Sequence, residues 1–335
     1  MNVIVGDIGG TKSRLAILST KAGPRKYLFK KTYSSLSFDS IESILNKFTN
    51  ESNLDIEHAC FGVAGPVVDG RARITNLPWV IDALKLQNKF DWKSVRLLND
   101  LEAVAYSIIA LKKEDLCTIQ KGDPDIGENI AVISPGTGLG QAFITRNDDA
   151  NVVNASEGSH ASFGPTNTLQ DGLLKYLREK NGNEHVSVEM VCSGKFGIPN
   201  IYEYLKNIGY GEEPKWLAEE LAGGKDPAPI IINIAKDQKR KNKLCTGTLD
   251  LFVSILGSEA GNLALKVLST GGIYLGGGIP SKLLDDLKKP IFIENLKKKG
   301  RFKKLLEKIP IHVILAENAG LIGAAVYLFE DILDR

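Results

Sequence analysis

The sequence predicts a mixed α/β protein built from two related lobes, and three observations lead to this fold class. The first part of the chain places strand-like runs and a helix in a β-β-β-α-β order, which is typical of a sheet covered by helices. A similar strand–turn–strand opening starts again near residue 130. In the middle of the chain apolar residues recur at helical spacing, so one lobe is expected to carry added helices. A length of 335 residues also suits about two domains.

The first half of the chain supplies the strands and helices of one lobe. Apolar alternation over residues 2–32 predicts three short strands. The elements expected after them are a helix over Asp39–Phe48, strands over Ala59–Ala64, Arg71–Thr75 and Val95–Leu98, and a helix over Asp100–Leu111. Asn99 directly precedes the last helix and is of a residue type that caps helices.

The second half is expected to repeat this opening. A strand over Ile130–Ser134, a turn and a strand over Leu139–Thr145 align with the first hairpin, so that Gly136-Thr137 matches Gly10-Thr11. The later elements expected are helices over Asn167–Lys180, Lys195–Ile208, Lys215–Leu221, Ala228–Lys236 and Thr248–Leu268, strands over Ile273–Leu275 and Ile311–Leu315, and a helix over Gly320–Leu333.

The last helix is expected to return to the first lobe, which makes that lobe discontinuous. The predicted boundaries are residues 1–112 plus 307–335 for a small α/β lobe and residues 113–306 for a large one. A ligand site between two such lobes is the default expectation.

Composition and charge narrow the class of function. A net charge of +2 gives no global field for nucleic acid or a membrane surface, so neither is expected as a partner. Cys60, Cys117, Cys192 and Cys245 form no CxxC pair, which predicts reduced thiols in a cytoplasmic protein. The N-terminus has no signal-peptide pattern, and no apolar run is long enough to span a bilayer.

The turn between the first two strands is the central motif. Gly9 and Gly10 allow a positive φ and a close backbone approach, and successive N–H groups in such a turn can hold phosphate oxygens. Asp7 would repel a phosphate, but it suits a divalent cation that accompanies one, directly or through water. An ordinary hairpin with a polar turn is the alternative.

An Asn-Asp pair stands at a predicted strand-to-helix junction. Asp100 at the start of a helix is favoured by the helix dipole, so a purely capping role for this pair is a strong alternative. The functional interpretation is a base that takes a proton from a substrate hydroxyl.

Three further stretches suggest ligand contacts. Gly136-Thr137-Gly138 is a second candidate phosphate turn, although a strand rather than a helix follows it. Glu157 and His160 lie three residues apart and can reach one polar ligand, whereas metal binding needs more ligands than this stretch offers. The run Gly276-Gly277-Gly278 ends a strand, either as a plain left-handed turn or as a close approach to a flat group such as a nucleoside.

Other phosphate-binding signatures do not occur in the sequence. There is no Walker A motif, and the His-Arg-Asp and Asp-Phe-Gly pair of protein kinases is missing. A bound phosphate is therefore expected to be held by glycine turns between the lobes.

Taken in order, these motifs resemble those of the bacterial-type ATP-dependent glucokinases, in the sugar kinase, Hsp70 and actin superfamily. The resemblance extends from about residue 2 to residue 328. The matching stretches are Gly6-Asp7-Ile8-Gly9-Gly10-Thr11, Leu98-Asn99-Asp100-Leu101-Glu102-Ala103, Gly136-Thr137-Gly138-Leu139-Gly140, Glu157-Gly158-Ser159-His160-Ala161, Leu275-Gly276-Gly277-Gly278-Ile279 and Glu317-Asn318-Ala319-Gly320-Leu321-Ile322-Gly323-Ala324-Ala325.

The resemblance implies a role for each matching residue. Asp100 would be the catalytic base. The residues implied for glucose are Asn99, Asp100, Glu157, His160 and Glu189. The residues implied for ATP are Gly6, Asp7, Ile8, Gly9, Gly10 and Thr11 at the phosphates, Thr137 and Gly138 at the β/γ-phosphates, and Gly276, Gly277 and Gly278 at the adenosine. Asp7 would lie near Mg²⁺, through water.

The resemblance also implies two RNase H-like (actin-like) lobes with mixed sheets around a central cleft. The implied reaction is transfer of the ATP γ-phosphoryl group to the 6-hydroxyl of glucose, by a cytoplasmic homodimer acting in glycolysis. A kinase for another hexose or an amino sugar is the first alternative. A non-catalytic sugar sensor is the second, and a polymerising or chaperone ATPase would lack the Glu157/His160 set.

Overall fold

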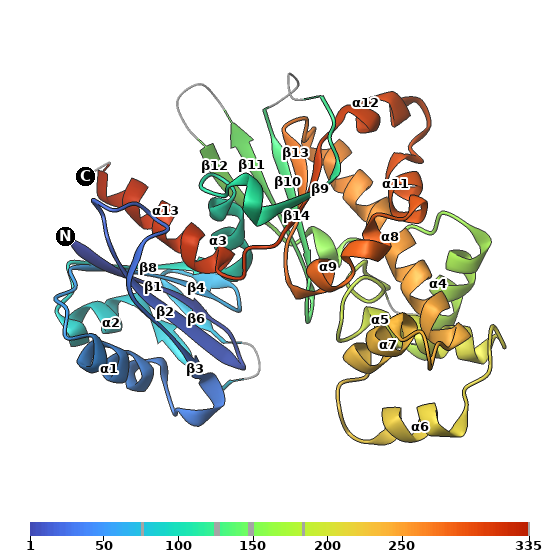
Figure 1. The fold of residues 1–335 in the computed structure, drawn as a ribbon, viewed down its shortest axis with the longest axis horizontal. Helices are drawn as coiled ribbons and strands as arrows, with labels where there is room; N and C mark the ends of the chain where they lie inside the picture. Colours follow the sequence, from blue (N-terminus) through green and yellow to red (C-terminus); the bar gives the residue numbers. More distant parts are fainter. Residues whose placement is uncertain (75–76, 124–127, 147–150, 183–184, 334–335) are drawn as a thin grey trace. The chain divides into compact units, whose positions relative to one another are not determined.

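The computed structural model describes residues 1–74, 77–123, 128–146, 151–182 and 185–333 (Figure 1). The chain divides into two compact units. Unit 1 comprises Met1–Leu116, Val153–Ala155 and Ala316–Arg335, and unit 2 comprises Cys117–Val152 and Ser156–Leu315. The predicted boundary at residue 307 is corrected to 316, because the strand at 311–314 pairs within the sheet of unit 2.

Unit 1 contains one five-stranded sheet, a small three-stranded sheet and four α-helices within its described residues. Its strands are β1 (Asn2–Ile8), β2 (Lys12–Ser19), β3 (Tyr27–Ser34), β4 (His58–Val63), β5 (Val67–Val68), β6 (Arg71–Arg73), β7 (Val80–Asp82) and β8 (Ser94–Asn99). Its helices are α1 (Ile41–Ser52), α2 (Ala83–Phe90), α3 (Asp100–Ser107) and α13 (Ala319–Leu333), with short 3₁₀ turns at Ser35–Ser37 and Lys113–Asp115.

The main sheet of unit 1 is covered by helices on both faces, as Figure 1 shows. Successive side chains of a strand point to opposite faces, and β1 follows this alternation. Ile4 and Ile8 pack in the cluster that includes α1 and α2, whereas Val3 and Val5 pack against α3 and α13. The return of the last helix to unit 1 is therefore confirmed, and α13 packs directly on the helix that begins at Asp100.

Among the described residues, unit 2 contains most of the helices and a six-stranded sheet, of which only Leu116 and Val153–Ala155 are assigned to unit 1. Its strands are β9 (Leu116–Gln120), β10 (Ile130–Pro135), β11 (Leu139–Arg146), β12 (Asn151–Ser156), β13 (Gly272–Leu275) and β14 (Ile311–Ile314). Its helices are α4 (Thr168–Lys180), α5 (Gly197–Asn207), α6 (Lys215–Ala222), α7 (Pro227–Lys236), α8 (Lys243–Val267), α9 (Gly278–Lys282), α10 (Leu284–Leu287), α11 (Pro290–Lys297) and α12 (Lys303–Lys308), with 3₁₀ turns at Gly158–His160 and Gly300–Phe302.

The two main sheets repeat one topology. The strand order is β3-β2-β1-β4-β8 in unit 1 and β12-β11-β10-β13-β14-β9 in unit 2. In each unit an antiparallel hairpin, β1–β2 or β10–β11, is followed by parallel strands, β4 and β8 or β13 and β14. The predicted mixed α/β class with two related lobes is confirmed, and β9 extends only the second sheet.

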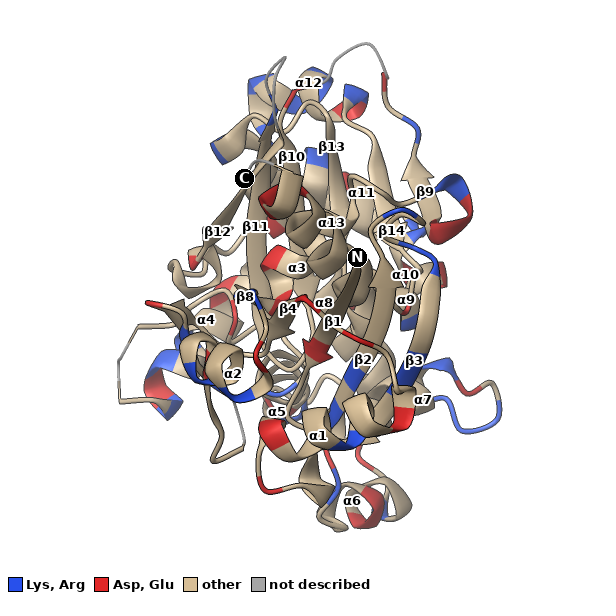
Figure 2. Ribbon diagram, turned by 90° about the vertical axis from the view of Figure 1, so that its left-hand side faces the viewer, with Lys and Arg blue, Asp and Glu red and all other residues tan. Residues whose placement is uncertain are grey.

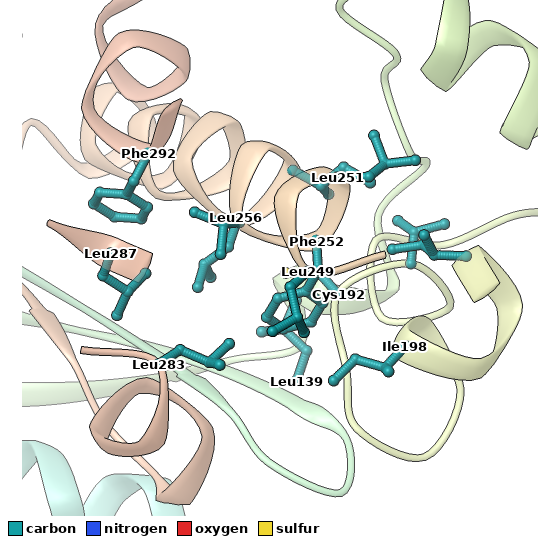
Figure 3. Packing of buried hydrophobic residues seen from close by; sticks show 14 of the residues in the cluster. Leu139, Cys192, Ile198, Leu249, Leu251, Phe252, Leu256, Leu283, Leu287 and Phe292 are labelled. Atoms are coloured by element: carbon teal, nitrogen blue, oxygen red, sulfur yellow. The ribbon is translucent and has the colours of Figure 1, made fainter. Parts of the chain in front are cut away.

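The core of unit 2 is organised around α8. Figure 3 shows Leu249 and Phe252 of this helix beside Leu139 of β11, while Phe292 of α11 lies on the other side of the cluster. Gly257 of α8 faces the Phe292 carbonyl so closely that an added Cβ would overlap it. This contact lets α8 and α11 pack with their backbones close together.

Several predicted elements differ from the structure. The helix at Asp100 ends at Ser107 rather than Leu111, because residues 108–110 tighten into i→i+3 turns. The long helix starts at Lys243 rather than Thr248, since Asn242 caps it. Helices α2 and α9–α12 and strands β5, β7, β9 and β12 were not predicted. Thr75, predicted as the end of a strand, lies outside the described residues.

Charged residues of both signs are interspersed on the elements drawn in Figure 2, and α6 and α12 each carry both.

All four cysteines are free thiols, three of them buried. Within the described ranges, the helices include none with the length and apolar character needed to cross a membrane.

Candidate active site

The carboxyl ends of β1, β4 and β8 bring two predicted acidic residues to one edge of the unit 1 sheet. These strands are parallel, and Asp7 of β1 stands opposite Gly62 of β4, whose neighbour Val63 stands opposite Asn99 of β8. Because Gly62 has no side chain, β4 and α3 can lie close together. An added Cβ would lie 2.9 Å from the Cβ of Ala103 on α3. Asp7 and Asp100 therefore face the same region of unit 1.

The helix that begins at Asp100 is fixed by a capping box. The Oδ1 atom of Asn99 accepts a hydrogen bond from the backbone of Leu101 at 2.9 Å, and Glu102 accepts one from the Asn99 backbone at 2.8 Å. The Nδ2 atom of Asn99 donates to the Gly65 carbonyl at 3.0 Å. The predicted capping role of Asn99 is confirmed.

Asp100 itself is an exposed residue at the first position of α3. Its Oδ1 atom accepts a hydrogen bond from the Leu101 backbone at 2.9 Å. Loss of hydration and the nearby charge of Asp7 raise the pKa of Asp100 to about 6, against the weaker opposing effect of backbone hydrogen bonds. A carboxylate with such a pKa is ionised at neutral pH and is a stronger base than an ordinary aspartate.

Asp7 is paired with Arg14 across the first hairpin. The two residues are register partners in β1 and β2, and Arg14 Nη1 lies 2.8 Å from Asp7 Oδ2. Burial raises the pKa of Asp7, and Arg14 opposes this effect. Arg14 was not predicted as a site residue, although a hairpin centred on Gly10-Thr11 places it opposite Asp7 by register alone.

The turn from Gly9 to Lys12 closes in a way that differs from the prediction. Neither Gly9 nor Gly10 has a positive φ, so the turn does not use the conformational freedom that these glycines allow. The Gly9 N–H donates to the Lys12 carbonyl at 3.0 Å, and the Gly9 carbonyl accepts from Ser35 Oγ at 2.7 Å. Space rather than handedness favours glycine at position 9, since a Cβ would lie 3.2 Å from the Lys12 carbonyl oxygen.

Gly6 and Ile8, the other two residues of this motif, lie inside β1 and are buried. A Cβ on Gly6 would lie 2.5 Å from a ring atom of Phe61 and 2.9 Å from Leu15. Gly6 and Ile8 therefore pack in the core next to the turn and are not exposed at its tip. Thr11 is exposed at its tip, and its carbonyl accepts a hydrogen bond from the Ser35 backbone at 2.9 Å.

In unit 2, Glu189 joins the second glycine turn to the Glu157–His160 segment. Its Oε2 atom accepts a hydrogen bond from the Leu139 backbone at 3.0 Å and lies against the Cα of Gly138. Its backbone N–H donates to the Ser159 carbonyl at 3.0 Å. The Gly136–Gly138 turn and the Glu157–His160 segment, about twenty residues apart in the sequence, therefore both contact Glu189.

The turn at Gly136–Gly138 is held on both sides. Gly136 N–H donates to the Gly138 carbonyl, and the backbones of Gly194 and Lys195 donate to the Gly136 and Thr137 carbonyls at 2.8 and 3.0 Å. Gly194 stands so close that an added Cβ would lie 2.7 Å from the Gly136 carbonyl oxygen. The predicted turn is thus part of a rigid loop pair.

The Gly276–Gly278 run lies next to the same hairpin. Gly276 N–H donates to the Ile133 carbonyl of β10 at 2.9 Å. Gly277 has a φ of +83° and a ψ of 174°, so it lies outside the left-handed helical region that a plain turn would use, and its Cα faces Ser134 Oγ. Gly278 begins the short helix α9, with open space where a Cβ would stand.

Glu157 and His160 present their side chains to solvent. His160 Nε2 lies 3.6 Å from Glu157 Oε2, and the two side chains are 60% and 83% exposed. Between them Ser159 is buried, and the Ala161 carbonyl accepts from the Val188 backbone at 3.0 Å. A firmly anchored turn therefore carries two polar side chains that remain available to a ligand.

Comparisons with known proteins give the family of this chain. A family model described as Glucokinase matches residues 4–331. The chain is 39% identical over 336 residues to a glucokinase of Nostoc punctiforme, covering 97% of this chain and 98% of that protein. It is 34% identical over 325 residues to a glucokinase of Yersinia enterocolitica, covering 97% of this chain and 95% of that protein.

Solved structures give the same answer for the fold. The crystal structure of a glucokinase from an Antarctic psychrotroph matches with a TM-score of 0.84 and 31% identity, covering 98% of this chain and 99% of that one. A glucokinase from Balamuthia mandrillaris in complex with glucose shares the fold, with a TM-score of 0.79 at 19% identity over 98% of this chain and 93% of that one. The chain therefore belongs to the glucokinase family.

Proposed function

We propose that this protein transfers the γ-phosphoryl group of ATP to the 6-hydroxyl of glucose and so produces glucose 6-phosphate. The observation that carries the proposal is the placement of Asp100 at the capped start of α3, at the sheet edge that also holds Asp7, with a pKa of about 6. Phosphoryl transfer needs mainly positioning and charge neutralisation, together with a base for the attacking hydroxyl. Asp100 would accept that proton.

Each unit offers polar groups that are proposed as sugar contacts. In unit 1, Asn99 already uses Oδ1 for the cap and one Nδ2 hydrogen for Gly65, so its second amide hydrogen would be the donor toward a hydroxyl. In unit 2, Glu157, His160 and Glu189 would supply the remaining polar contacts, and the anchored turn supports this role for the first two. A pocket of hydrogen-bonding groups rejects sugars that lack a partner hydroxyl.

The nucleotide would be held by the glycine turns. Since Gly9 N–H is used within its own turn, the phosphate donors proposed in unit 1 are the backbone groups of Gly10 and Thr11. Gly6 and Ile8 would keep this turn in place. In unit 2, Thr137 and Gly138 would face the β/γ-phosphates, and Gly276, Gly277 and Gly278 would approach the adenosine. The positive φ of Gly277 and the open space at Gly278 support that approach.

Mg²⁺ is the cation proposed to accompany ATP, and Asp7 fits it as a partial ligand. No group of three or more metal-ligating side chains occurs among the described residues. We therefore propose that Mg²⁺ is held mainly by the ATP phosphates and water rather than by protein side chains. Mg²⁺ typically keeps several waters and binds one or two carboxylates together with substrate phosphates. The mutual repulsion of Asp7 and Asp100 is the kind of environment that a cation relieves. When bound, Mg²⁺ supplies charge neutralisation on the phosphates.

The remaining proposals concern context. The repeated sheet topology supports membership of the sugar kinase, Hsp70 and actin superfamily. The free thiols support a cytoplasmic location. A role in glycolysis follows from the proposed product. A homodimer rests on the family resemblance, and light scattering after size exclusion measures it directly.

A coupled assay for ADP release tests the main proposal. We expect rapid release with glucose and ATP, slow release without a sugar, and much lower kcat/KM for the 2-deoxy and 4-epimeric analogues. Release that does not depend on any sugar would favour a chaperone-type ATPase. A higher kcat/KM for another hexose or an amino sugar than for glucose would favour the first alternative.

The pH dependence of the reaction gives a second test. Because the base must be ionised, kcat/KM for glucose should rise with pH, with a midpoint near the pKa of Asp100 at about 6, and level off at higher pH. The measurement is a pH–rate profile from pH 5 to pH 8 with saturating Mg-ATP. A midpoint near pH 4 would mean that Asp100 is not perturbed or is not the base.

A further inference from the structure

A buried polar network lies beneath the turn that carries Glu157 and His160. Gln141 of β11 is 2% exposed and Glu259 of α8 is 4% exposed. Gln141 Nε2 donates to Glu259 Oε1 at 2.8 Å, and Asn262 Nδ2 donates to Glu259 Oε2 at 2.9 Å. Both oxygens of a carboxylate buried in an otherwise apolar helix face are therefore hydrogen-bonded, which burial of such a group requires.

The network ends at a lysine that balances the buried charge. Lys299 Nζ donates to Asn262 Oδ1 at 2.6 Å and to Ser258 Oγ at 3.1 Å. Burial lowers the pKa of Lys299, and the charge of Glu259 opposes this effect. The carboxylate of Glu259 is thus linked to a cation through Asn262.

The other end of the network contacts the ligand turn. A Cβ added at Gly158 would overlap Gln141 Oε1, so the backbone of Gly158 rests directly on that amide oxygen. Gly158 follows Glu157 and opens the 3₁₀ turn that ends at His160. The height of this turn above the sheet is therefore set by the Gln141 side chain.

Glu259 fixes which way the Gln141 amide points. An ionised carboxylate only accepts hydrogen bonds, so the NH₂ group of Gln141 must face Glu259. The carbonyl oxygen of Gln141 then necessarily faces Gly158, where an NH₂ group would bring its hydrogens against the Gly158 backbone. The two residues come from β11 and α8. Their support at Gly158 adds to the hydrogen bond that Ser156 Oγ accepts from the Gly158 backbone.

We propose that Gln141 and Glu259 are positioning residues that hold the Glu157–His160 turn at the height needed to bind the sugar. This inference rests on the proposed glucose kinase function. It assigns the two buried residues to sugar affinity rather than to ATP binding or to the proton transfer at Asp100.

The first test is the variant Gln141→Leu. It leaves Glu259 Oε1 without a partner and replaces the amide oxygen under Gly158. We expect KM for glucose to rise about tenfold, the effect of losing roughly one good hydrogen bond. KM for ATP should stay within about twofold of the wild-type value. Unchanged KM for glucose in a folded variant overturns the inference.

Gln170→Leu is the matched control. Gln170 of α4 is fully buried, and its Nε2 atom donates to Ser254 Oγ of the same helix α8 at 3.1 Å. This variant also removes a buried amide–α8 hydrogen bond from unit 2, so it should lower the melting temperature while leaving KM for glucose unchanged. An equal rise of KM for glucose in both variants overturns the inference, because general loosening of unit 2 would then explain it.

A swap provides rescue and remains informative if Gln141→Leu does not fold. In Gln141→Glu/Glu259→Gln, the amide at 259 can donate to the carboxylate at 141 and accept from Asn262, and an oxygen still faces Gly158. KM for glucose should return to within about threefold of wild type. In Glu259→Gln alone, the amide oxygen at 259 can accept from Asn262 while its NH₂ group faces Gln141. Gln141 must then turn its own NH₂ group toward Gly158, so KM for glucose should be raised. A swap as impaired as Glu259→Gln overturns the inference.

The wild-type assay separates this inference from the proposed function. A wild-type protein that does not phosphorylate glucose contradicts the proposed function. A wild-type protein that does so, with Gln141 variants of unchanged KM for glucose, contradicts only the positioning role.

Discussion

Replacing Asp100 with asparagine should lower kcat for glucose by about 10²–10⁴-fold, the usual contribution of a general base. Asparagine keeps the shape of the side chain, and its Oδ1 atom can still accept the hydrogen bond from Leu101. The capping box of Asn99 and Glu102 does not involve the Asp100 side chain, so α3 should remain intact. Steady-state kinetics at saturating glucose and Mg-ATP measure the effect.

The same change should slightly raise stability at neutral pH. The pKa of Asp100 is 3.8 in the reference state and about 6 in the folded protein. The folded state therefore binds the Asp100 proton more tightly than the unfolded state does. The contribution of this proton to the free energy of unfolding is complete below about pH 4 and is lost as the pH rises through about 6. Asparagine has no such ionisation. Because Asp100 is exposed, the gain in melting temperature should be small.

Asp82→Asn is a matched control in the same unit. Asp82 also stands at a helix start, where it accepts hydrogen bonds from the Lys85 backbone and from Arg71 Nε. The Lys85 hydrogen bond is the largest of the effects that lower the pKa of Asp82, so its carboxylate stabilises the fold at neutral pH. This variant should lower the melting temperature and leave kcat unchanged. A similar loss of kcat in both variants would contradict the assignment of Asp100 as the base.

Gly323→Ala should both destabilise the protein and lower kcat. Gly323 of α13 lies against the backbone of α3, where an added Cβ would overlap the Ala103 carbonyl oxygen and lie 2.8 Å from the Ser107 backbone nitrogen. Backbone atoms cannot rotate away, so the two helices must move apart. Overpacking of this kind typically costs about 1–3 kcal/mol, and this contact belongs at the upper end. Because α3 begins at Asp100, its displacement also moves the proposed base.

Thermal denaturation and kinetics well below the melting temperature measure both effects. Gly257→Ala is the control, since its Cβ would overlap the Phe292 carbonyl oxygen between α8 and α11 of unit 2. It should destabilise the protein to a similar extent without displacing Asp100. If Gly323→Ala kept the wild-type kcat while Gly257→Ala lost activity, tight packing of α13 on α3 would have no role in placing the base.

The parts of the site that the sequence predicts are those with local signals. A hairpin around Gly10-Thr11 fixes its own register, so it also places Arg14 opposite Asp7, a pairing that the motif alone does not suggest. Asn99 and Glu102 form a capping box within one turn of helix, so the start of α3 follows from the sequence. The repeated strand–turn–strand pattern similarly predicts the two related sheets.

The parts that the sequence does not predict depend on distant contacts. Gln141 and Glu259 are 118 residues apart and meet only after α8 packs on the sheet. The only local signals are a polar residue in an apolar strand and a charge in an apolar helix. The Gly9 carbonyl accepts a hydrogen bond from Ser35 Oγ, 26 residues away, which the turn motif alone does not predict. Helices α9–α12 have four to eight residues each, too short for a clear periodic signal.

The position of α13 has a consequence for how the chain folds during synthesis. Unit 1 begins the chain, yet one of the two helices on one face of its sheet is made only after the whole of unit 2. Val3, Val5 and Cys60 therefore emerge from the ribosome before α13 can pack on them. They remain part of an exposed, aggregation-prone apolar surface until translation ends. The usual order, in which the leading domain matures first, is reversed, and we expect the nascent first lobe to be the segment that chaperones protect.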